Sequence, residues 1–119
     1  MNRARCHGAS APPQSSAAMI LELAVLDVKP HQTEEFEAAF REAQRIISAA
    51  PGYLSHELQR CVEKPNRHLL LVRWRRLEDH TEGFRKSEPY QRWKALLHHF
   101  YDPFPVVEHY VALNSDACE

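Results

Sequence analysis

The sequence predicts one α+β domain in which a four-stranded antiparallel sheet carries two helices on one face. The chain has 119 residues, 44% of them apolar, which is enough for one core and not for a second domain. Strand-like and helix-like patterns follow one another in the order β-α-β-β-α-β. Two of the strand segments are apolar at nearly every position, which is typical of strands buried on both faces. This order is that of the split βαβ, ferredoxin-like fold.

The chain begins with residues 1–18, which are small, polar and proline-bearing. They hold too little apolar surface to offset the entropy of ordering, so we expect a flexible tail, with Met19 as an alternative start of the chain. Residues 19–28 are apolar at nearly every position. Their Val, Ile and Leu content and Pro30 behind them favour a buried strand over a short buried helix.

A helix is predicted over residues 33–49. Thr33 is the expected N-cap, and two glutamates follow it at the positive end of the helix. Apolar residues then recur at spacings of three and four, which produces one apolar stripe. Pro51 and Gly52 end the helix. Packing against a sheet is enough to explain the stripe.

A pair of strands follows, joined by a turn at 63–66. Residues 53–62 alternate, and 68–74 form the second nearly continuous apolar strand. The alternation places one group of side chains on the same side: Leu54, His56, Leu58 and Arg60. Arg60 and Arg73 lie within strands, where an inward-pointing arginine would form an ion pair across a dimer, the preferred interpretation, or anchor a substrate.

The second helical region is predicted in two pieces. A short helix covers 77–86, and Ser87 then begins another helix through an N-cap and a first-turn proline at position 89. The chain closes with a loop at 102–105, a strand at 106–113 and a polar tail at 114–119. The predicted domain therefore spans 19–113.

One face of this sheet has no helix to cover it. Two helices cannot cover two faces, yet the first and third strands are apolar on both. The simplest cover is the same face of a second copy. We therefore expect a homodimer that packs sheet against sheet.

Composition excludes several classes of partner. The net charge of −1 does not attract nucleic acid or a membrane surface, and no apolar run approaches the roughly 20 residues that span a bilayer. No apolar segment between Arg5 and Ala18 resembles a secretory signal, so we expect a cytoplasmic protein. Cys6, Cys61 and Cys118 have no metal-type spacing, and we expect free thiols.

Aromatic and imidazole side chains gather in one part of the chain, between Trp74 and Tyr110. This stretch holds both tryptophans, three of the five phenylalanines, three of the four tyrosines and four of the eight histidines. Only 9% of the whole chain is aromatic, so the concentration indicates a pocket.

Three features of this stretch carry a resemblance to a known family. Trp74 closes the third strand, His80, Phe84, Arg85, Ser87 and Tyr90 follow in the split helix, and the last strand ends in Glu-His-Tyr at 108–110. Together with the topology, over roughly 19–113, they resemble the antibiotic biosynthesis monooxygenase family of dimeric α+β barrels. The resemblance implies a homodimer with one small cavity per subunit, between the sheet and the second helix. Relatives include cofactor-independent monooxygenases of aromatic phenols and quinols, haem-degrading enzymes and isomerases.

The haem-degrading relatives resemble one another at three positions, and this sequence departs from all of them. Their first-strand Asn is replaced here by Leu23 and Ala24, and their helix Trp by Phe84. The region of their haem-ligating His reads Arg92-Trp93-Lys94, although His98 or His99 could substitute at a shifted register. Haem degradation is disfavoured, and we expect no cofactor.

Oxidation without a cofactor needs a base, a group that holds an anion and an apolar enclosure. His80 is the first candidate for the base, because imidazole titrates near neutrality and position 80 borders the expected cavity. The alternative is a helix-start histidine bonded to nearby backbone. His109 is in phase with apolar neighbours of the last strand, so it is either a second catalytic group or a hydrogen-bonded core histidine.

Further side chains are candidates for contact with a small aromatic molecule. Arg85 would hold an anionic oxygen, or else face water or a partner subunit. Several aromatic residues would stack on a flat substrate, although helical spacing also fits plain core packing: Trp74, Phe84, Tyr90, Trp93 and Phe100. We expect Phe84 and Trp93 first among them to line a cavity.

Other chemistries lack the residues they need. His98 and His99 are adjacent on a helix and point about 100° apart, so a shared metal ion is not expected. Ser87 lacks a nucleophile elbow, and the glycines form no phosphate loop. The sequence therefore predicts a monooxygenase of a small aromatic or quinol-type compound, with a non-catalytic binding or stress-response module and a proton-transfer isomerase as alternatives.

Overall fold

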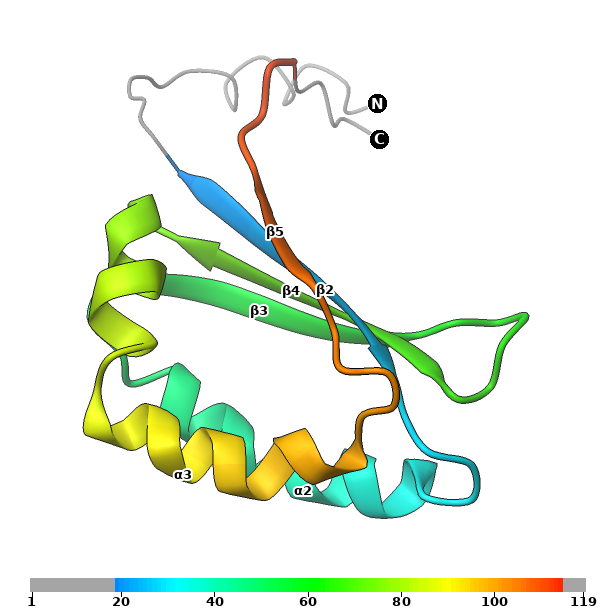
Figure 1. The fold of residues 1–119 in the computed structure, drawn as a ribbon. Coiled ribbons are helices and arrows are strands. Elements are labelled where there is room, and N and C mark those ends of the chain that lie inside the picture. Colours follow the sequence, from blue (N-terminus) through cyan, green and yellow to red (C-terminus); the bar gives the residue numbers. More distant parts are fainter. Residues whose placement is uncertain (1–18, 115–119) are drawn as a thin grey trace, which may run out of the picture.

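The computed structural model describes residues 19–114, and its elements follow the predicted order (Figure 1). The predicted N-terminal tail, and all but the first residue of the predicted C-terminal tail, lie outside the described residues. The strands are β2 (Ile20–Asp27), β3 (Tyr53–Arg60), β4 (Arg67–Trp74) and β5 (Val107–Tyr110). The helices are α2 (Thr33–Ile47), the π-helix η1 (Asp79–Phe84), α3 (Glu88–Leu97) and the 3₁₀-helix η2 (His98–Phe100).

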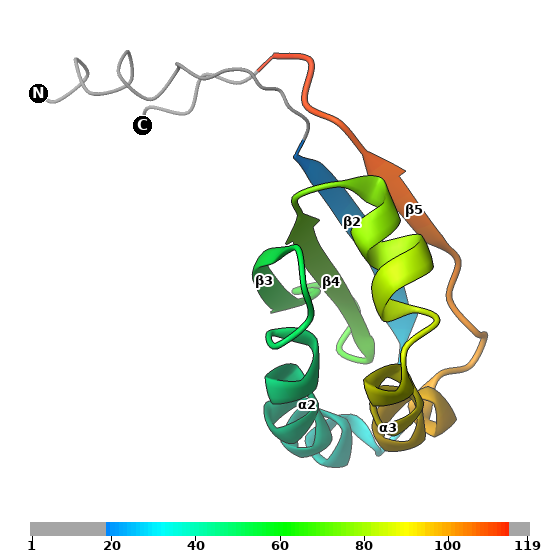
Figure 2. The same ribbon diagram turned by 90° about the vertical axis from the view of Figure 1, so that its left-hand side faces the viewer.

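The four strands form one sheet in the order β3-β4-β2-β5, and each neighbouring pair is antiparallel. Helices α2 and α3 lie next to each other on one face of this sheet, as the two views in Figure 1 and Figure 2 show. The predicted ferredoxin-like fold class is confirmed. The other face carries no helix in the part of the chain that the structure describes.

Strand β2 separates the two faces of the sheet residue by residue. Glu22, Ala24 and Leu26 are buried toward the helices. Leu21, Leu23 and Val25, which alternate with them, are only half-buried on the open face. The same alternation runs along β4, where Leu70 and Val72 are buried. Apolar side chains on both faces of these strands explain why their sequences read as continuous apolar runs.

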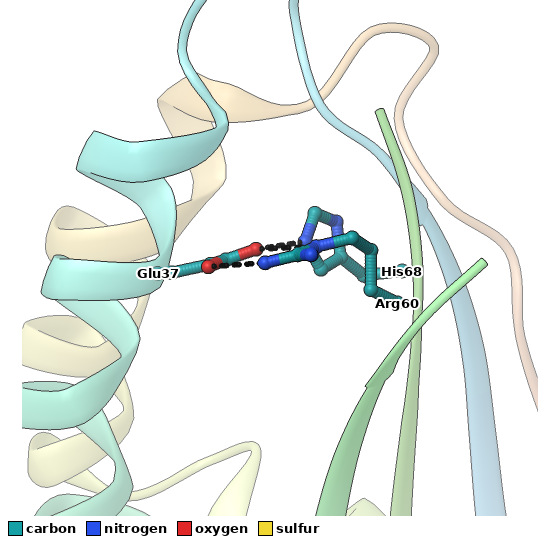
Figure 3. Close-up of polar contacts among 3 residues, drawn as sticks. All are labelled: Glu37, Arg60 and His68. Atoms are coloured by element: carbon teal, nitrogen blue, oxygen red, sulfur yellow. Dashed lines mark hydrogen bonds and ion pairs between the residues drawn. The ribbon is translucent and has the colours of Figure 1, made fainter. Parts of the chain in front are cut away.

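A polar junction ties helix α2 to the sheet (Figure 3). The carboxylate of Glu37 accepts two hydrogen bonds from Arg60, at 3.1 and 3.2 Å, and lies 2.8 Å from Nε2 of the buried His68. The Arg60 and His68 bonds hold the pKa of Glu37 below its usual value. Arg60 is therefore paired within its own chain, and its pairing across a dimer or with a substrate stays a prediction.

Two local predictions on this side of the molecule are corrected. Helix α2 begins at Thr33, but the residue before it, Gln32, occupies the cap position without a side-chain hydrogen bond, so Thr33 is not the N-cap. A register shift between Tyr53 and Ser55 inserts one extra residue in β3. The shift turns Tyr53 to the side of His56, to whose Nδ1 its hydroxyl bonds, although simple alternation places them on opposite sides.

The second helical region and the last strand also differ in detail. The piece after β4 is a π-helix of six residues, a rare form that often occurs at functional sites. Ser87 caps α3 as predicted, because its hydroxyl accepts a hydrogen bond from the backbone N–H of Tyr90 at 3.3 Å. Strand β5 covers only four of the eight residues predicted for it, and Val111 and Leu113 beyond it are exposed.

Gly52 connects α2 to β3 through a backbone conformation that favours glycine, with φ at 85°. A Cβ atom at this position would lie 2.2 Å from Cγ of Asp79. The close approach brings the turn against the start of η1, where Asp79 accepts a hydrogen bond from the backbone N–H of Arg76 at 3.0 Å. Gly52 thereby helps to place η1 and the histidine at its second position.

Candidate active site

A cavity of about 400 Å³ lies between the sheet and the chain segment that runs from η1 through α3 to β5. Helix α3 and the loop after η2 supply much of its aromatic wall, and β2 supplies its floor. The lining combines aromatic side chains with a few polar ones, which is typical of a small-molecule site. The aromatic members are Phe84, Tyr90, Trp93, Tyr101 and Phe104, and the polar members are Glu22, His80, Arg85 and His98.

Glu22 is the unexpected member of this lining. It is the only charged residue between Met19 and Leu26, and the alternation of β2 points it to the buried side. Only 5% of its surface is exposed. Its Oε1 accepts a hydrogen bond from Nε1 of Trp74 at 2.9 Å, and Trp74 is itself fully buried. A buried carboxyl with a single neutral donor is poorly suited to carry a full charge.

His80 lies against the same carboxyl. Its ring stacks on Trp74 with centroids 5.3 Å apart and planes at 18°, and it is 3% exposed. Nε2 is 3.5 Å from Oε1 of Glu22, and Nδ1 is 2.8 Å from Nε2 of His109. The two predicted histidines therefore meet, although one comes from η1 and the other from β5. The ladder between β2 and β5 explains the meeting, because it pairs Glu22 with His109.

Burial shifts the pKa values of the acid and the imidazole in opposite directions. It raises the pKa of Glu22 from 4.5 to about 7, against the opposing effects of the Trp74 hydrogen bond and the Arg85 charge. It lowers the pKa of His80 from 6.5 to about 3, with further lowering by Arg85 and His109. Near neutral pH the imidazole is therefore neutral, and the carboxyl is divided between its two forms.

Arg85 places a permanent positive charge at the edge of the cavity. It follows η1 directly, where its backbone N–H donates to the carbonyl oxygen of His80 at 2.9 Å. Its charge lowers the pKa of His80 and of His109. The residue is exposed to water and also lines the cavity, and its role in holding an anionic oxygen stays a prediction.

Two tyrosine hydroxyl groups complete the polar lining. Burial raises the pKa of Tyr90 and of Tyr101, so both keep their protons at neutral pH. A protonated hydroxyl can donate a hydrogen bond to an anionic oxygen in the cavity. Tyr101 was not identified from the sequence as a site residue.

The structure separates the predicted site residues into three groups. Five line the cavity: His80, Phe84, Arg85, Tyr90 and Trp93. His109 lies outside the lining and reaches it through His80. The prediction that Trp74 contacts substrate is corrected. This side chain is fully buried behind Glu22 and His80, so it can act only through them.

Metal binding and disulfide formation find no support in the described part of the chain. Among residues 19–114, no group of three or more His, Cys, Asp or Glu side chains could hold a metal ion. Cys61 is a free thiol, as expected, while Cys6 and Cys118 lie outside the described residues. No helix within 19–114 has the length and apolar character needed to cross a membrane.

Replacing Trp74 by phenylalanine is expected to raise the pKa of Glu22 above its value in the parent protein. The aromatic ring stays, but the hydrogen bond that stabilises the ionised carboxylate is lost. The buried acceptor left without its donor should also cost about 1–3 kcal/mol of stability. Infrared titration of the carboxyl band would measure the shift, and an unchanged or lower pKa would contradict it.

Comparison with known proteins places the chain in a family. The sequence model of the antibiotic biosynthesis monooxygenase family matches residues 19–96, which is more than half of the chain. The protein belongs to this family of α+β domains, and the resemblance inferred from the sequence is confirmed.

Individual proteins of known sequence or structure are also similar to this chain. Protein YczJ of Bacillus subtilis (strain 168), itself uncharacterized, is 56% identical over 92 residues, which are 77% of this chain and 97% of that protein. A Bordetella bronchiseptica structure, described as a candidate antibiotic biosynthesis monooxygenase, is 31% identical with a TM-score of 0.79, covering 82% of this chain and 100% of its own. SnoaB of Streptomyces nogalater, a cofactor-independent oxygenase, shares the fold at 16% identity, with a TM-score of 0.73 over 83% and 97% of the two chains.

Proposed function

We propose that this protein is a cofactor-independent monooxygenase that oxidises a small phenolic or quinol-type aromatic compound with dioxygen. The observation that carries the proposal is the buried pair of Glu22 and His80 in the wall of an aromatic cavity. Family membership supports the same class of activity.

The lining suits a flat, weakly acidic guest. Phe84 and Trp93 pack edge to face with ring centroids 5.8 Å apart, and both offer part of their surface to the cavity. Aromatic walls of this kind bind planar rings by burial and stacking. Arg85, Tyr90 and Tyr101 belong to the same lining, and they would stabilise a phenolate oxygen by charge and by hydrogen bonds from the hydroxyls.

The pair of Glu22 and His80 acts as one proton-accepting unit in this proposal. The sequence favours His80 as the base, but its pKa of about 3 makes the imidazole alone a weak one. Glu22, with a pKa of about 7, can take a phenol proton near neutral pH and return it later. Neutral His80 beside it adjusts the hydrogen bonding of the carboxyl as the charge changes.

The electrons come from the substrate itself. Loss of the proton leaves an electron-rich phenolate, which gives one electron to dioxygen to form superoxide and a substrate radical. The two combine at the ring carbon as a peroxide. The O–O bond then breaks as the ring carbon loses its hydrogen, so that one phenol and one O₂ yield one quinone and one water. The proton held by Glu22 goes to the departing oxygen, which leaves as hydroxide, and the ring-carbon hydrogen leaves as a proton that converts this hydroxide to water.

Oxygen consumption tests the proposal. Purified protein would be mixed with anthrol- and quinol-type compounds in the presence of a metal chelator and without flavin or haem. The expected result is O₂ uptake above the buffer control that chelator does not reduce, with one quinone formed per O₂. Absence of uptake, or uptake that chelator abolishes, would contradict the proposal.

A proton-transfer isomerase is the second candidate, and the same carboxyl favours it. An acid that accepts and returns a proton near pH 7 needs no oxygen to move a proton between two carbons. The distinguishing result would be incorporation of deuterium from D₂O into a bound enolisable ligand without O₂ uptake. Neither exchange nor uptake would leave a non-catalytic binding module.

We further propose that the protein is a homodimer through the open face of its sheet. Five apolar side chains of the two central strands are only half-buried there: Leu21, Leu23, Val25, Leu69 and Leu71. A contiguous apolar surface of this kind on two neighbouring strands is typical of an interface.

Light scattering should give twice the mass of the chain at micromolar concentration. Leu23→Asp would place a charge at the centre of the proposed interface and is expected to give a monomer that keeps its far-ultraviolet circular dichroism. Ala38→Asp, at an exposed position of α2, is the matched control and should remain dimeric. A parent protein that is already monomeric would contradict the proposed interface.

A further inference from the structure

The imidazole of His80 connects two proton-bearing groups on opposite sides. Its Nε2 faces the buried carboxyl of Glu22 at 3.5 Å, and its Nδ1 is hydrogen-bonded to Nε2 of His109 at 2.8 Å. His109 does not line the cavity, is half-buried, and belongs to β5, which is an edge strand of the sheet. Its Nδ1 makes no hydrogen bond with residues 19–114 and is not among the fully buried unpaired nitrogens of that range, so this nitrogen can contact water.

We propose that His109 is a proton port, through which Glu22 exchanges its proton with solvent by way of His80. This inference rests on the proposed function, because a port is needed only when a substrate fills the cavity. Such a substrate covers the side of Glu22 that faces the cavity. The protonation of Glu22 can then be reset only through groups outside the cavity lining. The two histidines are such a route.

The exchange balances without any further reactant. When Glu22 is protonated, its hydroxyl faces Nε2 of His80, Nδ1–H of His80 donates to Nε2 of His109, and His109 carries its own proton on Nδ1. Moving one proton along each link leaves a carboxylate, Nε2–H on His80 and Nε2–H on His109. One proton leaves Nδ1 of His109 for water. Uptake of a proton from solvent is the same sequence in reverse.

One link is longer than a hydrogen bond. The 3.5 Å between Glu22 and His80 must shorten to about 3 Å for transfer, and catalytic contacts often tighten in this way when a ligand binds. The charged and titratable groups around the chain of transfer are Arg85 after η1, Tyr90 of α3, Tyr101 after η2 and Glu22 of β2. Arg85 disfavours an imidazolium at either histidine, which favours transfer between neutral rings.

The test follows the tautomers of the two rings in the free protein. Imidazole nitrogens with and without hydrogen differ widely in their ¹⁵N resonances, so labelled protein can be titrated from about pH 6 to about pH 8, across the pKa of Glu22. We expect both rings to change from Nδ1–H to Nε2–H together, with one midpoint near pH 7. In Glu22→Gln this joint change should disappear. A fixed tautomer at His109, or a change that persists in Glu22→Gln, would overturn the proposal.

His109→Gln provides a second variant that keeps a hydrogen bond to His80. The glutamine amide can donate to Nδ1 of His80 and its carbonyl oxygen can accept from Nδ1–H, but the side chain cannot pass a proton on, so the change of tautomer at His80 should become slower than in the parent protein. Glu108→Gln is the matched control, because this exposed neighbour contacts Tyr110 instead of the site. A change of tautomer at His80 that is as fast in His109→Gln as in the parent protein would show that protons reach His80 by another route.

The outcome does not depend on oxygen chemistry, so failure of the port and failure of the monooxygenase can be told apart. Where turnover is found, His109→Gln should lower kcat about tenfold, less than loss of a direct base, and leave KM unchanged. Added imidazole should restore part of the rate in His109→Ala. Full activity in His109→Gln without added buffer would count against the port even if the oxygenase stands.

Discussion

Glu22→Gln should lower turnover of a phenolic substrate by about 10²–10⁴-fold, the usual contribution of a positioned acid or base. Glutamine has the same shape as the protonated acid and can still accept the hydrogen bond from Trp74. It cannot take a proton. The loss should therefore appear in kcat, whereas KM changes little because the apolar lining remains intact.

Comparison of His80→Gln with Glu22→Gln separates the contributions of the two residues to turnover. His80→Gln removes a neutral ring that contacts the carboxyl, so we expect a smaller loss than in Glu22→Gln and a change in the pH at which the rate rises. Stopped-flow measurement of phenolate formation under nitrogen would isolate the proton step from the reaction with O₂. Glu108→Gln is again the control. Full turnover in Glu22→Gln would remove the carboxyl from the mechanism.

Most of the fold could be predicted because its signals are local. Continuous apolar runs identified β2 and β4, and Ser87 with the proline after it gave the start of α3 correctly. The bulge at Tyr53 and the π-helix were not predictable, since both arise where the backbone adjusts to packing between distant segments. The predicted length of β5 was wrong for a related reason. Apolar residues continue to Leu113, but the ladder with β2 ends at Tyr110.

The site was predictable in part. His80 and His109 were singled out separately, and only the register of β2 against β5 shows that they meet. Glu22 was missed, although a lone carboxylate inside an apolar strand is a visible signal, because a buried acid has to be neutral or paired. Trp74 was assigned to substrate contact for its size and position, and no periodicity reveals that two polar side chains lie between it and the cavity.

The free energy of unfolding should also depend on pH because the pKa of Glu22 is raised in the folded protein. In the unfolded chain a glutamate releases its proton near pH 4.5, whereas Glu22 in the folded chain keeps it to about pH 7. Between these values the folded state binds more protons than the unfolded state, so the contribution of Glu22 to the free energy of unfolding falls as pH rises. At 1.36 kcal/mol for each pKa unit, the loss amounts to about 3 kcal/mol and is complete above about pH 7.

His80 opposes this trend over part of the range. Its folded pKa of about 3 lies below the 6.5 of an unfolded histidine, so the folded state binds fewer protons between these values and stability falls as pH drops. The two slopes cancel between about pH 4.5 and about pH 6.5. Over this range the summed contribution of the two residues to the free energy of unfolding is therefore nearly independent of pH. A pH profile of the parent protein alone would reveal neither group.

Single variants separate the two contributions. Urea unfolding of the parent protein and Glu22→Gln, at one fixed protein concentration because association adds to stability, would give the difference in free energy at each pH. We expect the parent to lose about 3 kcal/mol relative to Glu22→Gln between about pH 4.5 and about pH 7.5. A pH-independent difference would mean that Glu22 titrates like an exposed glutamate. Such a carboxyl would be fully ionised at neutral pH, and it would be too weak a base to take a phenol proton.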